Sequence, residues 1–187
     1  SIGKWDIFYY VYGALHRPAY RTQFADALKR ELPRIPYLAD FWTVSKAGKQ
    51  LADLHLGYET VEEWPLSPGP SPAGGRGESA RDSLSPIPWG KGPGIEGGLY
   101  RVADKMRLSR DKTEIAVNPS LTLRGIPAEA FEYKLGNRSA LEWVIDQYQV
   151  KGSSDPNRAD DERYIVKSVG QVIRVSVETA KIVKALG

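Results

Sequence analysis

The sequence predicts an α+β fold in which N-terminal helices precede a small antiparallel β-sheet, which C-terminal helices follow. Two observations support this class. Apolar residues recur at three- and four-residue steps through the first 60 residues, which is the period of helices with one packed face. Beyond residue 98 they alternate along short segments separated by turn residues, which is typical of strands.

The first helix is predicted to start near Asp6, its expected N-cap, and to stop at His16, because Pro18 cannot continue it. Its apolar face would consist of Ile7, Phe8, Val11, Tyr12 and Leu15. The tyrosines of this stretch are therefore predicted to be core residues that serve as scaffold.

A second helix is predicted from Pro18, which suits a first helical turn. Its apolar stripe would be Tyr20, Phe24, Leu28 and Leu32, four residues apart, and Pro33 would end it. A third helix is predicted with Phe41, Val44, Ala47, Leu51 and Leu54 on one stripe. Residues 1–61 are thus predicted to be a helical part.

Residues 62–98 differ in composition. Their sequence is mostly Pro, Gly and Ser, with few side chains able to build a core. We expect a flexible insertion here, because a loop of this length without secondary structure is unusual in a compact domain.

Residues 99–187 are predicted to be an α+β part of the same domain. A hairpin is expected from "LYRVADKMRLS" and "TEIAVN", with "LTLRGI" as a third strand. Alternation should place Lys105 and Arg107 on one face and Met106 and Leu108 toward the core. Arg110 and Lys112 would lie at or near the turn, free to reach a phosphate. A proline-started short helix or turn follows within residues 125–135. Ser139 and Glu142 form a capping-box pattern that opens a helix through Tyr148. Residues 162–186 fit a strand by alternation and a helix by length, and we predict a helix.

Composition excludes several kinds of site. The chain has no cysteine, which removes disulfides, thiolate nucleophiles and cysteine metal sites and suits the cytoplasm. No segment is long and apolar enough for a membrane span, and no secretory signal precedes the first helix, so no membrane partner is expected. Met106 is the only methionine, so we expect a fragment of a longer protein.

Motifs for catalysis are weak. Residues 92–97 match a dinucleotide fingerprint, but a proline-rich stretch precedes them where a strand is needed. Asp111, Glu132 and Lys134 imitate the order of a metal-dependent nuclease, although surface salt bridges explain them better. His16 and His55 are too few for a histidine metal site. We predict no catalytic residue, no metal ligand and no enzyme activity for this chain.

Basic side chains gather on and after the predicted hairpin. The formal net charge is +3, and because residues 62–98 carry three basic and five acidic side chains, the rest carries +5. Arginine and lysine can contact phosphates, and arginine, lysine and asparagine can read base edges. A solvated surface is an equally good explanation of the pattern. The candidate DNA-binding residues are Arg101, Lys105, Arg107, Arg110, Lys112, Arg124, Lys134, Asn137 and Arg138.

Several blocks in a common order resemble the C-terminal specificity region of Type ISP restriction–modification enzymes. The resemblance covers nearly the whole chain except residues 62–98. The blocks are "DIFYYVYGALHRPAYRTQFADALKRELPRIP", "FWTVSKAGKQLADLHLGYE", "KMRLS", "GIPAEAFEYKLGNRSALEWVIDQYQV", "DPN" and "VSVETAKIV".

The resemblance implies a DNA target-recognition domain without chemistry of its own. It would direct an adenine methyltransferase and an ATP-dependent translocase and nuclease in the same polypeptide to a DNA site. S-adenosylmethionine, ATP and magnesium would belong to that parent protein, and the partners would be double-stranded DNA and the upstream methyltransferase and ATPase domains. The alternative is a helical docking platform that joins those two domains without reading DNA.

Overall fold

The structure is a computed structural model that describes residues 1–70 and 98–187. It confirms the predicted α+β class. The helices are α1 (Lys4–His16), α2 (Pro18–Gln23), η1 (Ala27–Lys29), α3 (Phe41–Leu56), η2 (Tyr58–Thr60), η3 (Ala128–Phe131), α4 (Ala140–Gln147) and α5 (Tyr164–Ala185). The strands are β1 (Ser67–Gly69), β2 (Arg107–Leu108), β3 (Glu114–Asn118), β4 (Leu121–Arg124), β5 (Lys134–Leu135) and β6 (Arg138–Ser139).

The chain divides into two compact units. We call residues 1–61 with 175–187 the helical unit, and the described part of residues 62–174 the sheet unit. The helical unit differs from the predicted helical part because the end of α5 joins it. No helix among the described residues is long and apolar enough to cross a membrane.

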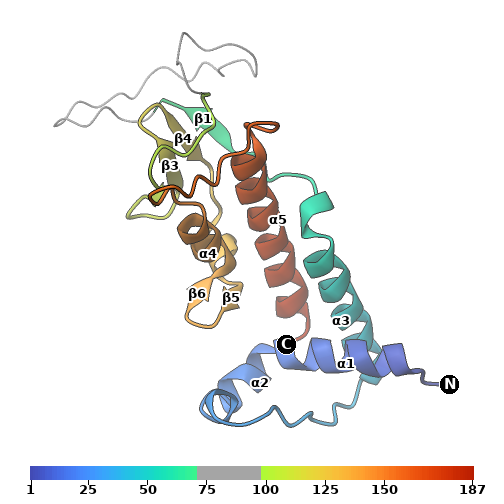
Figure 1. The fold of residues 1–187 in the computed structure, drawn as a ribbon. Helices are drawn as coiled ribbons and strands as arrows, with labels where there is room; N and C mark the ends of the chain where they lie inside the picture. Colours follow the sequence, from blue (N-terminus) through green and yellow to red (C-terminus); the bar gives the residue numbers. More distant parts are fainter. Residues whose placement is uncertain (71–97) are drawn as a thin grey trace. The chain divides into compact units, whose positions relative to one another are not determined.

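In the helical unit, α1 crosses α3 at a point where both helices carry glycine (Figure 1). A Cβ atom on Gly48 would overlap the carbonyl oxygen of Tyr9, and one on Gly13 would overlap the carbonyl oxygen of Val44. Only residues without a side chain allow two helix backbones to approach this closely. The Ser45 hydroxyl also donates to the Asp6 carbonyl across the crossing, at 2.9 Å.

This crossing decides which face of α1 is buried, and the predicted face is wrong in part: Val11 and Tyr12 pack against the core, but Ile7 and Phe8 do not. Tyr10, Gly13 and Ala14 are buried, whereas about half of each of the Ile7 and Phe8 side chains is exposed. The predicted N-cap is wrong as well. Gly3 is the N-cap, and the Asp6 carboxylate accepts a hydrogen bond from its backbone N–H at 2.8 Å.

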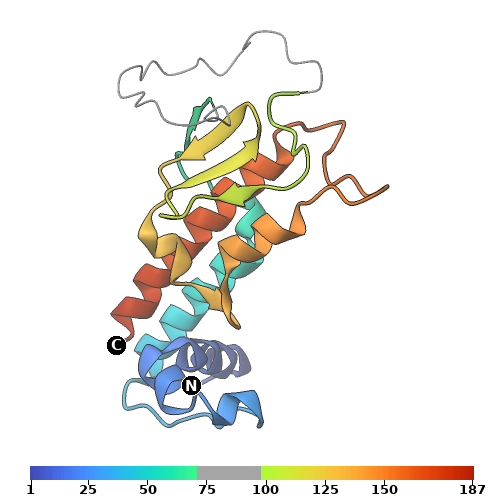
Figure 2. The ribbon, with the colours of Figure 1, turned by 90° about the vertical axis from the view of Figure 1, so that its left-hand side faces the viewer.

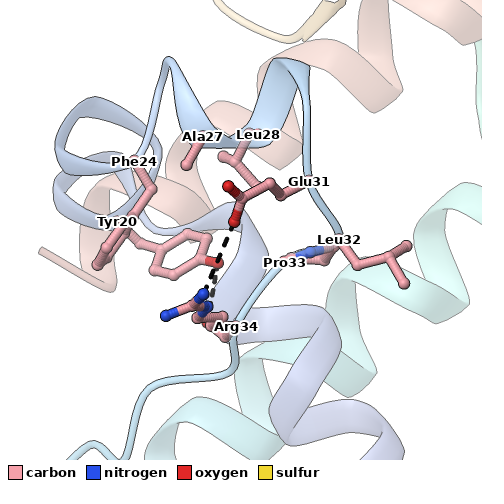
Figure 3. A pocket seen from close by; sticks show the side chains of 8 residues that line it. All are labelled: Tyr20, Phe24, Ala27, Leu28, Glu31, Leu32, Pro33 and Arg34. Atoms are coloured by element: carbon pink, nitrogen blue, oxygen red, sulfur yellow. Dashed lines mark hydrogen bonds and ion pairs between the residues drawn. The ribbon is translucent and has the colours of Figure 1, made fainter.

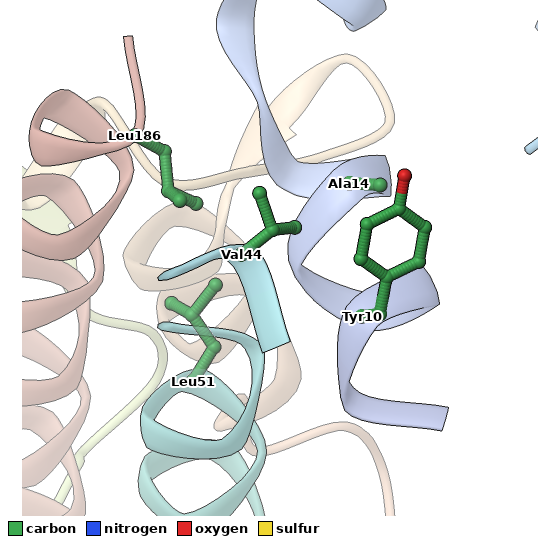
Figure 4. Packing of buried hydrophobic residues seen from close by; sticks show 5 residues of the cluster. All are labelled: Tyr10, Ala14, Val44, Leu51 and Leu186. Atoms are coloured by element: carbon green, nitrogen blue, oxygen red, sulfur yellow. The ribbon is translucent and has the colours of Figure 1, made fainter. Parts of the chain in front are cut away.

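The core of the helical unit is a small apolar cluster from α1, α3 and the C-terminal residues after α5 (Figure 4). Its buried members are Tyr10, Ala14, Val44, Leu51 and Leu186. The Tyr10 hydroxyl donates to the Pro36 carbonyl and accepts from the Leu38 N–H, so it also ties the extended segment before α3 to the core.

Tyr12, predicted to be core, is half-buried: it packs against the core cluster and its hydroxyl belongs to a polar network. Its hydroxyl is hydrogen-bonded to Nδ1 of His55 at 2.7 Å, and Nε2 of His55 is bonded to the Thr179 hydroxyl at 2.9 Å. Burial lowers the pKa of His55 to about 4, with His16 adding a smaller repulsion. Both rings are therefore neutral at pH 7, because burial lowers the pKa of His16 too.

The predicted second helix is shorter than expected. α2 ends at Gln23, and a short η1 follows in place of the helix predicted to reach Pro33. Of its predicted stripe only Tyr20 is buried, while Leu32 is 90% exposed. Since helices of this length depend on packing, a stripe without a core to cover it does not sustain the helix.

The sheet unit contains an antiparallel sheet in the order β1-β4-β3-β2 among the described residues. The predicted hairpin and third strand are confirmed as β2, β3 and β4. β1 was not predicted, because Ser67–Gly69 lies in the range assigned to the insertion. It pairs with β4, and the Trp64 N–H donates to the Gly170 carbonyl of α5 at 3.0 Å. The remainder of the predicted insertion, residues 71–97, lies outside the described residues.

The core of the sheet unit forms between the sheet, α4 and the first half of α5, which lie beside one another in Figures 1 and 2. The segment that was ambiguous between strand and helix is helical throughout, as predicted. The predicted short helix and the capping box at Ser139 are confirmed as η3 and the start of α4. The fully buried side chains include Ile115, Val117, Leu123, Leu141, Ile165, Val169 and Ile173.

Candidate nucleic-acid interface

Four of the nine candidate DNA-binding residues lie around one groove of the sheet unit. Arg107 comes from β2, Lys105 lies two residues before it and bridges to Gln149, and Asn137 and Arg138 come from the turn and strand that precede α4. The groove has a volume of about 650 Å³. Its other lining residues are Met106, Leu108, Glu142, Ile145 and Asp146.

The hairpin positions its two basic residues by strand alternation. Met106 is 3% exposed, whereas Lys105 and Arg107 on either side of it are exposed, as predicted. The Arg107 guanidinium lies 3.4 Å from the Asp104 carboxylate, and both side chains are about 70% exposed. Such an exposed pair is weak, so Arg107 can exchange this partner for a ligand group.

The opposite wall is the two-stranded β5–β6 ribbon, whose strands pair antiparallel across Gly136 and Asn137 (Figure 1). Gly136 has a φ of 70°, a value that a two-residue hairpin turn favours and that glycine adopts without strain. Asn137 is exposed beside it. The Arg138 guanidinium forms an ion pair with Asp146 and lies 5.6 Å from the ring centroid of Trp143.

These contacts give Arg138 a carboxylate and an aromatic partner while about half of its side chain stays exposed. The Trp143 indole N–H donates to the Leu135 carbonyl at 3.0 Å, which holds the ring against the ribbon. An arginine held by a carboxylate and an aromatic ring loses little side-chain entropy when it makes further hydrogen bonds. The wall therefore presents an ordered guanidinium and an exposed amide next to each other.

Lys112, expected to be free to reach a phosphate, has two partners within the sheet unit. It lies at the hairpin turn with a φ of 61°, and its ammonium group donates to the Glu142 carboxylate at 2.9 Å and lies 4.9 Å from the Phe131 ring centroid. This hydrogen bond, with those from Ser139, lowers the pKa of Glu142 to about 2. Lys112 thus links the hairpin to α4. Arg110, at the same turn, is exposed and has no carboxylate within ion-pair distance among the described residues.

Three other candidates lie outside the groove. The Arg101 guanidinium donates to Asp155 at 2.8 Å, and the Arg124 guanidinium donates to Glu114 at 2.9 Å. Both pairs connect segments of the sheet unit, so we assign them to the fold. Lys134 is exposed on β5 and does not line the groove.

Arg138 also contacts two residues that the sequence did not single out. Trp143 and Asp146 face Arg138 from α4, although their positions on an amphipathic helix predict only an exposed face. The sequence signal that could have identified Trp143 is its place on the polar side of a short helix, where it is half exposed. Their pairing with Arg138 depends on how α4 folds against the ribbon, which no local pattern specifies.

The nuclease arrangement considered from sequence gains no support. The Asp111 carboxylate accepts from the Ser109 hydroxyl and the Thr113 N–H, which closes the hairpin turn and lowers the pKa of Asp111. Across residues 1–70 and 98–187, no group of three His, Cys, Asp or Glu side chains is arranged to hold a metal ion. The polar groups that line the groove are the nitrogen donors of Lys105, Arg107, Asn137 and Arg138 and the carboxylates of Glu142 and Asp146.

Comparisons with known proteins point in one direction. A family model described as the Type ISP C-terminal specificity domain matches residues 1–178. No curated protein matches the chain. A solved structure of a nuclease-deletion mutant of the Type ISP restriction–modification enzyme LlaGI, in complex with a DNA substrate mimic, is 35% identical with a TM-score of 0.76.

Two further solved structures are similar over all of this chain. The ATP-dependent Type ISP restriction–modification enzyme LlaBIII bound to DNA is 31% identical with a TM-score of 0.77, and the DrdV–DNA complex is 33% identical with a TM-score of 0.75. In all three cases 100% of this chain is covered. The match covers 14% of the LlaGI chain, 11% of the LlaBIII chain and 18% of the DrdV chain. This chain therefore spans a small fraction of the length of these relatives.

Proposed function

The chain belongs to the Type ISP C-terminal specificity domain family, and from this premise we propose that it recognises a specific double-stranded DNA sequence for a larger restriction–modification enzyme. The observation that carries the proposal is the groove whose lining brings together Arg138, which is paired with Asp146, and Asn137, Lys105 and Arg107. The three similar structures come from complexes that contain DNA or a DNA mimic, which supports the same function.

The geometry suggests two roles for these residues, contact with base edges and contact with phosphates. The β5–β6 ribbon is a two-stranded element, and the major groove of B-DNA admits such a ribbon. Arg138 would donate two hydrogen bonds to a guanine edge, and Asn137 would pair with an adenine edge. Lys105, Arg107 and Arg110, which are exposed and weakly paired or without an ion-pair partner among the described residues, would contact phosphates or adjacent bases.

The chain itself would perform no chemistry. The adenine methyltransferase, the ATP-dependent translocase and the nuclease would lie in other parts of the polypeptide, together with the sites for S-adenosylmethionine, ATP and magnesium. The upstream methyltransferase and ATPase domains would be its partners, and the whole would act in the cytoplasm, where the DNA substrate is. A docking platform without DNA reading is not favoured, since the similar structures were solved with DNA or its mimic.

Substitution of Arg138 in the full-length enzyme tests the assignment. Arg138→Ala should reduce discrimination at one base pair of the site by about 1–3 kcal/mol and leave the salt dependence of binding nearly unchanged. Arg138→Lys should restore affinity but only part of the discrimination, because an ammonium lacks the planar fork. Lys151→Ala, at an exposed lysine that does not line the groove, is the matched control.

The measurement is binding to the cognate duplex and to duplexes with single base-pair changes, at several salt concentrations. A uniform loss of affinity with a salt slope reduced by about one would make Arg138 a phosphate contact instead. Unchanged affinity, slope and site choice in Arg138→Ala and Asn137→Ala would show that DNA is read elsewhere.

A further inference from the structure

The helical unit contains one short segment with a clear excess of positive charge. Residues 17–34, which we call the basic arm, contain α2 and η1. They carry five basic and two acidic side chains, a net charge of +3. A local excess of this size attracts an acidic partner.

The basic arm folds around a small apolar pocket (Figure 3). Its volume is about 190 Å³, and Phe24, Leu28 and Pro33 contribute to an apolar lining, with Glu31 and Arg34 among the polar residues. Pockets for small-molecule ligands usually measure about 300–1,000 Å³. This one has room for a single apolar side chain, such as the anchor residues found at protein interfaces.

The pocket is fixed in place before anything binds. The Tyr20 hydroxyl donates to the Arg34 carbonyl at 2.9 Å, which closes the arm on itself (Figure 3). The buried Tyr10 hydroxyl holds the next residues by its bonds to Pro36 and Leu38. A preformed pocket costs little ordering entropy on binding, which favours its use as a receptor.

Apolar side chains beside the pocket remain in water. Of the residues that line the pocket, Leu32 is 90% exposed and Leu28 is 36% exposed, and Tyr37, three residues after Arg34, is fully exposed. Apolar side chains that gather in water mark interaction sites in soluble proteins. Leucine and tyrosine next to arginine are the composition of a protein interface rather than of a surface that contacts only phosphates.

The cations around the pocket are available for a partner. Arg21 and Arg30 have no carboxylate within ion-pair distance among the described residues, and Arg34 lies 3.8 Å from Glu31 in a pair that is mostly exposed. We propose that the basic arm docks an acidic segment from another domain of the same polypeptide, which inserts one apolar side chain into the pocket. This proposal is independent of DNA reading by the groove.

Two arguments favour that occupant. DNA would satisfy the arginines but would leave the apolar lining and Leu32 in water, whereas an acidic segment with an apolar anchor covers both. The matching part of the similar solved chains is only 11–18% of their length, so a tethered domain would meet the arm at high effective concentration.

The test uses the full-length enzyme with the photo-reactive residue p-benzoylphenylalanine in place of Leu32, which is exposed enough to accept it. Irradiation should produce an intramolecular cross-link to one acidic segment outside these 187 residues, mapped by mass spectrometry. The same residue at Lys46, exposed on α3, is the control and should not label that segment. The proposal would be overturned if the photo-reactive residue cross-linked only to residues 1–61, or if it formed no cross-link to protein.

Charge reversal separates a protein partner from DNA. Arg30→Glu, added to the Leu32 photo-reactive variant, should lower the cross-link yield at least threefold, whereas the matched exposed change Lys46→Glu should not. DNA affinity and its salt slope should be the same in both. If Arg30→Glu instead reduces the salt slope by about one and the photo-reactive residue labels DNA, the arm is a phosphate contact and the proposal is wrong.

Discussion

Replacing Gly48 by alanine tests the helix crossing on which the helical unit depends. A Cβ atom at this position would lie 2.7 Å from the Gly13 nitrogen and 2.8 Å from the Tyr9 carbonyl carbon, where ordinary contacts are 3.4–4 Å. Both neighbours are backbone atoms, so no side chain can turn aside. The two helices would have to separate by roughly 1 Å at their closest point.

Two opposing effects set the size of the loss. Alanine improves helix propensity over glycine by about 1 kcal/mol. Against this, overpacking a well-fitted contact costs typically about 1–3 kcal/mol, and separation also lengthens the 2.9 Å bond from Ser45 to Asp6, whose loss adds about 1 kcal/mol. The net expectation is a loss of about 1–3 kcal/mol.

Thermal and urea unfolding of the 187-residue chain, followed by circular dichroism, measures this loss of stability. For a chain of this length the expected loss lowers Tm by about 3–10 °C. Lys46→Ala, at an exposed position of the same helix, should change stability by less than about 0.5 kcal/mol. A Gly48→Ala protein as stable as the parent, or more stable, would mean that the two backbones are not in contact and would refute the reasoning.

Three further outcomes are expected. Tyr10→Phe should lower the free energy of unfolding in urea by about 1–3 kcal/mol, because the Pro36 carbonyl and the Leu38 N–H lose their partner. An unchanged free energy would mean that these two groups are hydrogen-bonded to water. Because the pKa of His55 falls from an ordinary 6.5 to about 4 on folding, the unfolded chain binds the extra proton between these values, and stability should fall as pH drops from 6.5 to 4. His55→Gln should flatten the dependence of Tm on pH in that window. An unchanged slope would mean that other groups cause the pH dependence. In DNA binding by the full-length enzyme, Arg110→Ala should reduce the salt slope by about one whereas Lys112→Ala should not, because Lys112 is held by Glu142; equal effects would contradict this distinction.

The candidate site could be predicted from sequence as a set of basic residues but not as a geometry. Alternation along the strand correctly placed Met106 inside and Arg107 outside, because side-chain direction follows from the backbone alone. The pairing of Lys112 with Glu142, 30 residues away, depends on how the hairpin lies against α4. Arg138 likewise became an ordered group only through Asp146 on the next helix.

The sequence by itself determined the features that need only neighbouring residues. Pro18 opens α2, the Ser139 capping box opens α4, and the alternation of residues 114–118 makes β3, because each depends on local hydrogen bonding or side-chain spacing. The tertiary structure decided what depends on distant contacts. Gly48 selects the buried face of α1, and β4 pairs with Ser67–Gly69 more than 50 residues earlier in the chain. A helix can bury any of several faces and a strand can pair with any free edge, so only the complete set of packed neighbours selects among them.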